Sequence, residues 1–146
     1  MLLETLETQI EQDVQRALDE DLGSGDITAQ LIPQESTWKA SVYTRDPAIL
    51  CGRNWFDAVF RQLDDRVDIR WYANDGEAIV PHQVVCTLEG PTRCLLSGER
   101  TALNFLQTLS GTATLANTCA RRLEGLSTRI LDTRKTIPGL RRAQKY

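Results

Sequence analysis

The sequence predicts an α+β fold, in which helices and strands occupy different stretches of the chain. Three patterns support this prediction: an amphipathic helical pattern near the N-terminus, short alternating segments in the middle, and a long helical pattern in the last third. Apolar residues make up 41% and charged residues 25% of the 146 residues, which are the values of a globular domain rather than of a disordered chain.

The first helix is predicted over roughly residues 3–21, because apolar side chains recur there at three- and four-residue steps. Those side chains are Leu3, Leu6, Ile10, Val14, Ala17 and Leu18. Gly23 is expected to end this helix. In the GSGDIT turn that follows, Asp26 can cap a short helical turn through its carboxylate.

Short strands and one helix are predicted in the middle of the chain. Alternation of apolar and polar residues places the strands at Trp38–Thr44, Ala48–Cys51, Val67–Ala73 and Val84–Leu88. Gly90 and Pro91 are expected to break the last of them. An apolar stripe from Trp55 to Leu63 predicts a helix that packs in the core, with Asn54 as its N-cap.

The turn-strand pattern of residues 74–90 resembles that of hammerhead domains, such as lipoyl and biotinyl carriers. A carrier requires an exposed lysine at a tight hairpin tip, and no lysine lies between Lys39 and Lys135. A carrier function is therefore excluded, whereas a hammerhead-like, open-faced α/β sandwich remains the expected fold of this region.

The last third of the chain is predicted to contain further helices and one strand. These elements are expected at Cys94–Leu109, Thr112–Leu123, Thr128–Thr133 and Gly139–Tyr146. Gly111 is expected to break or kink the helical pattern, and Gly125 suits a helix C-cap. A boundary at Ser110–Gly111 would divide the chain into an N-terminal domain, residues 1–110, and a second unit, residues 111–146.

Charge is distributed unevenly along the chain. Residues 121–146 hold eight Lys/Arg against two acidic residues, a balance of +6, whereas the net charge of the whole chain is −3. The cations are interleaved with apolar residues and a Pro-Gly turn, without the aromatic residues of a nucleic-acid-binding stripe, so we expect no nucleic-acid partner. No apolar stretch is long enough to span a membrane, and the N-terminus lacks the features of a signal peptide.

The cysteine pattern indicates free thiols. The four cysteines are widely spaced, with no CxxC pair and a single histidine, His82, which excludes common zinc spacings. We therefore expect reduced, buried cysteines and a cytoplasmic protein. His82 itself follows Pro81 and is interpreted as a surface turn residue.

The segment TRILDTRKTIPGLRRAQKY, residues 128–146, carries the strongest functional signal. Asp132 follows the apolar pair of the predicted strand, and Thr133, Arg134, Lys135 and Thr136 come next in immediate succession. Two adjacent cations and two hydroxyls at the C-terminal end of a strand are suited to holding an anion, because ligands bind at that end in α/β folds. The alternative is a surface turn with solvated charges.

Three motifs make the chain similar to the quinolinate phosphoribosyltransferases. They are EDLGSGDIT at residues 20–28, ERTALNFLQTLSGTAT at residues 99–114, and LDTRKTIPGLR at residues 131–141. The resemblance covers essentially the whole chain but only the N-terminal portion of that family, whose members continue beyond the position of Tyr146. It implies that residues 111–146 begin an incomplete α/β barrel and that this chain holds only part of an active site.

The family's reaction transfers a phosphoribosyl group from phosphoribosyl pyrophosphate to quinolinate with loss of CO2, in the biosynthesis of NAD. The resemblance implies four substrate-binding residues. Arg134 would grip quinolinate, Lys135 would face phosphoribosyl pyrophosphate, Thr133 would line the pocket, and Arg100 would complete the site of the neighbouring subunit in a homodimer. It also implies Mg²⁺ with phosphoribosyl pyrophosphate, held mostly by ligands outside this chain, so the 146 residues alone are expected to be inactive.

Several residues and one function stay open. Asp132 is read as structural, fixing Arg134 or capping the loop, in preference to a metal ligand or a base. Arg141, Arg142 and Lys145 lie where cations oppose a helix dipole, which suggests that they serve an anionic ligand or a partner chain. The alternative function is a non-catalytic dimerisation or interaction fragment of the same enzyme.

Overall fold

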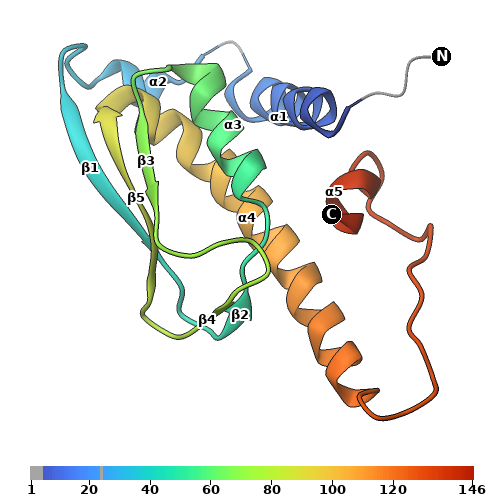
Figure 1. Ribbon diagram of the computed structural model, residues 1–146. Coiled ribbons are helices and arrows are strands. Elements are labelled where there is room, and N and C mark those ends of the chain that lie inside the picture. Colours follow the sequence, from blue (N-terminus) through green and yellow to red (C-terminus); the bar gives the residue numbers. More distant parts are fainter. Residues whose placement is uncertain (1–4, 24) are drawn as a thin grey trace.

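A three-stranded antiparallel sheet and two helices packed on it form the centre of the computed structural model, which describes residues 5–23 and 25–146 (Figure 1). The strands lie in the order β1-β5-β3, with bounds Thr37–Tyr43 (β1), Val84–Pro91 (β5) and Asp68–Trp71 (β3). A second, two-stranded sheet pairs β2 (Ala48–Ile49) with β4 (Ala78–Ile79). The protein is thus a mixed α/β structure with a small sheet, as predicted.

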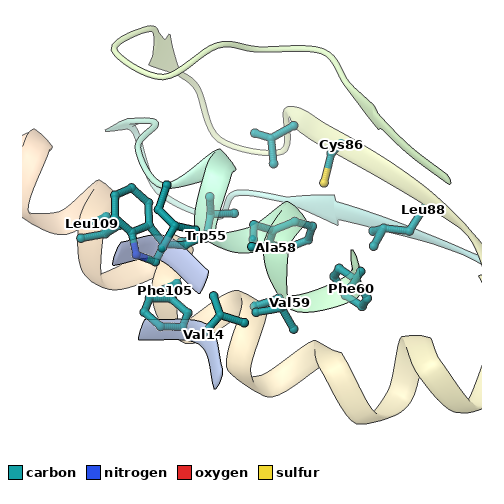
Figure 2. Packing of buried hydrophobic residues seen from close by; sticks show 14 of the residues in the cluster. Val14, Trp55, Ala58, Val59, Phe60, Cys86, Leu88, Phe105 and Leu109 are labelled. Atoms are coloured by element: carbon teal, nitrogen blue, oxygen red, sulfur yellow. The ribbon is translucent and has the colours of Figure 1, made fainter. Parts of the chain in front are cut away.

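Helices pack against the sheet and against each other. Their bounds are Leu6–Leu22 (α1), Ile27–Gln30 (α2), Arg53–Leu63 (α3), Thr92–Arg122 (α4) and Arg141–Lys145 (α5). Side chains of α3 and α4 join the inward-facing residues of β5 in one apolar cluster (Figure 2). No helix in the described part of the chain is long and apolar enough to cross a membrane.

The core is built around α3. Trp55 is fully buried, and its indole Nε1 donates to Oδ2 of Asp13 on α1 at 3.1 Å. Phe56 meets Trp71 of β3 edge to face, with ring centroids 5.2 Å apart. Because Asp13 also accepts from Arg16 at 2.6 Å, its buried carboxylate is paired, as burial of a charge requires.

Helix α1 confirms the predicted amphipathic pattern, although Leu3 lies outside the described residues. Thr5 caps its N-terminus, and Gly23, at a φ of 50°, ends it. Asp26 caps α2 as predicted, because the amide of Ala29 donates to its carboxylate at 3.0 Å. His82, as predicted, lies in an exposed turn, which precedes β5.

Three local predictions were wrong. Asn54 is inside α3 and not its N-cap: the helix begins at Arg53, after Gly52 with a φ of 110°, and Asp75 accepts the Arg53 amide at 3.2 Å. Gly90 and Pro91 do not break the strand, since β5 runs from Val84 to Pro91. A Cβ at Gly90 would lie 3.0 Å from the Cα of Val67, which accounts for a glycine at this position. Gly111 does not break the helix, since α4 is continuous from Thr92 to Arg122.

The predicted strand Thr128–Thr133 was also wrong, because residues 124–140 contain neither helix nor strand. A strand is stable only with a partner for its backbone hydrogen bonds, and no described strand pairs with this segment. Ile130 and Leu131 are accordingly exposed. The final helix is shorter than predicted and begins at Arg141 rather than Gly139.

The C-terminal segment leaves the far end of α4, which extends well beyond the sheet, and returns so that α5 contacts α1 and α4 (Figure 1). Ala143 of α5 is buried there, and the ring of Tyr146 packs edge to face on Trp55 at 5.3 Å. The segment is thus attached to the rest of the fold at its two ends, and the chain between them is exposed.

Candidate functional site

Arg100 lies on α4 with 74% of its side chain exposed. Its Nη1 donates to Oδ1 of Asp21, in the last turn of α1, at 2.8 Å. The hydroxyl of Thr101, the next residue on α4, donates to the second oxygen, Oδ2, of Asp21 at 3.4 Å. The hydrogen bond and the negative charge of Asp21 raise the pKa of Arg100, so the guanidinium is a permanent cation.

The segment after Asp21 is bound to the same helix. Ser97 donates its hydroxyl to Oδ2 of Asp26 at 2.8 Å, and Arg93 donates Nε to the carbonyl of Ile32 at 2.7 Å. Arg93, Ser97 and Arg100 follow one another at four- and three-residue steps, so they share one face of α4. The N-terminal half of α4 is therefore the surface to which residues 21–32 are attached.

Thr133, Arg134 and Lys135 lie in the exposed loop between α4 and α5. The hydroxyl of Thr133 accepts from the Lys135 amide at 2.8 Å, which closes a tight turn. Arg141 donates Nη2 to the Arg134 carbonyl and Nε to the Thr136 hydroxyl, both at 3.3 Å. The loop backbone is thus held from both sides, while the Arg134 and Lys135 side chains make no ion pair with any described residue.

Asp132 forms an ion pair with Lys145 of α5. This agrees with a structural role for Asp132, but the cation that it holds is Lys145 and not Arg134. Arg141 and Lys145 both serve this loop from within the chain, a role that the sequence did not suggest.

The described residues offer no cluster of three or more His, Cys, Asp or Glu side chains that could hold a metal ion. The carboxylate next to the cations Arg134 and Lys135, that of Asp132, is occupied by Lys145. The part of the chain that the structure describes therefore does not fit a Mg²⁺ site by itself.

A hollow of about 500 Å³ lies between α1, α4 and the loop before α5. Asp21 and Thr101 line it on one side, and Pro138, Gly139 and Leu140 line it on the other. Arg100, Thr133, Arg134 and Lys135 are not among the described residues that line it. The structure therefore brings Arg100 to Asp21 but does not gather the four predicted substrate-binding residues into one pocket.

Sequence reasoning gave no role to Asp21, Arg93 or Ser97. The motif EDLGSGDIT contains both Asp21 and Asp26, but the sequence predicts a role only for Asp26, as a helix cap. A contact between residues 79 positions apart, such as that of Asp21 and Arg100, has no signal in a single sequence.

Two family models match the chain. "Quinolinate phosphoribosyl transferase, N-terminal domain" matches residues 26–110, and "Quinolinate phosphoribosyl transferase, C-terminal domain" matches residues 112–146. The first match alone covers more than half of the chain.

Curated relatives include the probable carboxylating nicotinate-nucleotide pyrophosphorylase of Bacillus subtilis, 39% identical over 127 residues, which are 87% of this chain and 44% of that protein. The carboxylating nicotinate-nucleotide pyrophosphorylase of Homo sapiens is 38% identical over 120 residues, 81% of this chain and 40% of that protein. The chain thus spans somewhat less than half the length of the curated relatives it matches.

Solved structures agree with these matches. The nicotinate-nucleotide pyrophosphorylase from Francisella tularensis superposes with a TM-score of 0.92 at 41% identity, over 97% of this chain and 51% of that chain. NadC from Streptococcus pyogenes gives a TM-score of 0.92 at 32% identity, over 99% of this chain and 52% of that chain. The described fold is therefore similar to about half of each of these proteins.

Proposed function

The chain belongs to the quinolinate phosphoribosyl transferase family, and from this premise we propose that it is part of a carboxylating nicotinate-nucleotide pyrophosphorylase. The proposed reaction joins quinolinate to phosphoribosyl pyrophosphate and yields nicotinate mononucleotide, pyrophosphate and CO2. The pyridine nitrogen forms a bond to C1 of the ribose as the bond to pyrophosphate breaks. The bond from C2 to the 2-carboxylate then breaks and releases CO2, the positive ring nitrogen stabilises the electron pair that stays on C2, and a proton from solvent adds there.

The observation that carries this proposal is the pair of adjacent, exposed cations in the loop after α4. Both substrates are polyanions, so a site for them must present fixed positive charge before they arrive. Arg134 can donate two parallel hydrogen bonds to a carboxylate of quinolinate, each worth about 1.5–3 kcal/mol. Lys135 is suited to the phosphate groups of phosphoribosyl pyrophosphate as a compact positive charge. Thr133 accepts from the Lys135 amide and so stabilises the turn that presents both cations.

Mg²⁺ is proposed to accompany phosphoribosyl pyrophosphate, since hard cations bind phosphate oxygens together with carboxylates. Because the described residues do not fit a metal site, the protein ligands of this ion would come from outside this chain.

We further propose that residues 111–146 begin an α/β barrel. The exposure of Leu131, 83% in this chain, supports a partner surface for it. A cytoplasmic location is proposed with the four free thiols in support.

The active site is proposed to be shared in a homodimer, with Arg100 supplied by the neighbouring subunit. Its support is the exposed position of Arg100 on α4, since Arg100 is not among the described residues that line the hollow beside the 138–140 loop. The test uses the full-length enzyme that contains this chain. Arg100→Ala and Arg134→Ala homodimers should each lose most activity.

Mixing the two variants under conditions of subunit exchange should restore about a quarter of wild-type activity, because half of the dimers are mixed and each has one intact site of two. Exchange is checked by native mass spectrometry. No recovery despite complete exchange would show that Arg100 acts within its own subunit, and the shared-site proposal would then be wrong.

The alternative function, a non-catalytic dimerisation fragment, is favoured by one observation: the buried apolar cluster comes almost wholly from residues 10–109, with Ala143 as its buried member from the C-terminal segment. Purified 146-residue chain is expected to show no quinolinate-dependent release of pyrophosphate. Measurable turnover by this chain would contradict both the fragment role and the need for ligands outside it.

A further inference from the structure

Asp21 is placed to hold the Arg100 guanidinium from one side. The ion pair joins Oδ1 of Asp21 to Nη1 of Arg100 at 2.8 Å. The carboxylate is mostly buried, with 18% of its side chain exposed, whereas the guanidinium is open to solvent. A buried carboxylate that faces an exposed cation restrains the cation without covering it.

The carboxylate is itself held in position. Thr101 donates to its second oxygen, so both oxygens of Asp21 are occupied by α4. Bonds from Ser97 to Asp26 and from Arg93 to the carbonyls of Ile32 and Gln30 attach the following segment to the same face of α4. These contacts fix the end of α1 on α4. Along α4 they come from residues before Arg100, namely Arg93 and Ser97, and from Thr101 directly after it.

Only Nη1 of Arg100 is engaged within the described part of the chain. Nε and Nη2 remain available, and they form the edge of the guanidinium that can donate two parallel bonds to a carboxylate or phosphate. Holding one terminal nitrogen also removes rotamer freedom that an exposed arginine would otherwise lose on binding.

We infer that Asp21 is a positioning residue, which orients Arg100 for an anionic substrate bound by the neighbouring subunit. This inference rests on the proposed shared site. The competing explanation is a surface ion pair that contributes only to stability, as many exposed pairs do. The two explanations differ in what Asp21→Asn changes.

In the full-length enzyme, Asp21→Asn should lower kcat/KM for quinolinate about five-fold, the size expected for an ion pair whose arginine is largely exposed. The melting temperature should stay within about 2 °C of wild type, because asparagine keeps the shape and can still accept from Thr101. Asp21→Glu, which retains the charge, should recover most of the loss.

Asp19→Asn is the matched control. Asp19 is an exposed carboxylate two residues away on α1, and it accepts from Gln15 of the same helix at 2.9 Å. No hydrogen bond or ion pair joins its side chain to α4 within the described residues, so its variant should keep wild-type kcat/KM. An equal loss in Asp19→Asn would mean that negative charge near the end of α1, rather than the contact with Arg100, is what matters.

Subunit mixing gives a sharper test, because Asp21 must act in the subunit that supplies Arg100. With a five-fold defect per altered site, equal mixtures of Asp21→Asn and Arg134→Ala should reach about 30% of wild type. Mixtures of Asp21→Asn and Arg100→Ala should reach only about 10%, since no mixed dimer then has an intact site. The reverse ranking would place Asp21 with Arg134 and overturn the inference.

The mixture of Arg100→Ala and Arg134→Ala separates this inference from the proposed function. If that mixture fails to recover activity, the shared site is wrong. If it recovers while Asp21→Asn keeps wild-type kcat/KM, the shared site stands and Asp21 is only a structural partner of Arg100.

Discussion

The two parts of this chain on either side of Ser110 differ in how far their apolar side chains are buried. Before Ser110, large residues such as Trp55, Phe56 and Leu50 are at most 1% exposed. After it, Ala143 is the only buried residue, and Leu115 and Leu131 are 66% and 83% exposed. The first part closes its own core, whereas the second part presents apolar side chains and cations to solvent.

This difference shows which sequence patterns form secondary structure without a neighbouring segment. A helix makes its hydrogen bonds within a single segment, so α4 continues for 31 residues although most residues of its last turns are exposed. A strand depends on a neighbour, and the segment with the pattern of a buried strand is an exposed loop here. The second part therefore carries an apolar, strand-like pattern that the described residues of this chain leave exposed.

The largest expected effect tests this contrast directly. Trp55→Ala should lower the free energy of unfolding by about 3–5 kcal/mol, because it empties a buried site and leaves Asp13 without one donor. Leu131→Ala should change it by less than about 0.5 kcal/mol. Urea unfolding followed by fluorescence and circular dichroism measures both. A loss of more than about 1 kcal/mol in Leu131→Ala would mean that its segment packs against something in solution.

The cysteines before Ser110 should react more slowly with alkylating agents than Cys119, which follows it. Burial raises the pKa of Cys86 to about 12, and burial followed by a nearby carboxylate raises that of Cys51 and of Cys94 to about 11. A higher pKa means less thiolate at a given pH, so at pH 8.5 these thiols should react with iodoacetamide about a hundredfold or more slowly than in urea. Mass spectrometry of labelled peptides measures the rates.

Cys119 supplies the comparison for that experiment, because it lies in the protruding half of α4 and is only partly buried. It should be the first of the four thiols to be labelled in the folded chain. If Cys86 reacted as fast as Cys119, the sheet would have to open far more often than its packing implies.

Two glycines of α4 should respond to alanine in opposite directions. A Cβ at Gly98 would lie 2.7 Å from Cε1 of Phe60 and 3.0 Å from Cδ1 of Leu63, so Gly98→Ala should cost about 1–3 kcal/mol through overpacking. A Cβ at Gly111 would meet nothing within 4 Å, so Gly111→Ala should stabilise the helix by about 0.5–1 kcal/mol. Thermal unfolding distinguishes them, and destabilisation by Gly111→Ala would indicate a hidden contact there.

The same division explains which elements of the fold could be predicted from the sequence. The helices α1, α3 and α4 and the strands of the sheet follow from periodicity, since each pattern is local and its apolar face finds a partner within the chain. The cap of α3 could not be predicted, because Asp75 reaches it from a turn 22 residues away. Resemblance named Arg100, Thr133, Arg134 and Lys135, but only coordinates could pair Arg100 with Asp21 and Asp132 with Lys145.

The smallest expected effect on stability belongs to a variant that tests the function of the second part. In the full-length enzyme, Arg134→Lys keeps the charge and loses the planar fork, so kcat/KM for quinolinate should fall about ten-fold or more. Stability should not change, because the Arg134 side chain has no ion-pair partner among the described residues and only its backbone carbonyl is bound, by Arg141. Arg129→Lys is the matched control, since Arg129 is an exposed arginine of the same loop.

A defect confined to phosphoribosyl pyrophosphate kinetics would exchange the roles proposed for Arg134 and Lys135. A loss of stability without a kinetic defect would instead make the cationic loop part of the scaffold, and the contrast between a self-contained first part and a substrate-binding second part would fail.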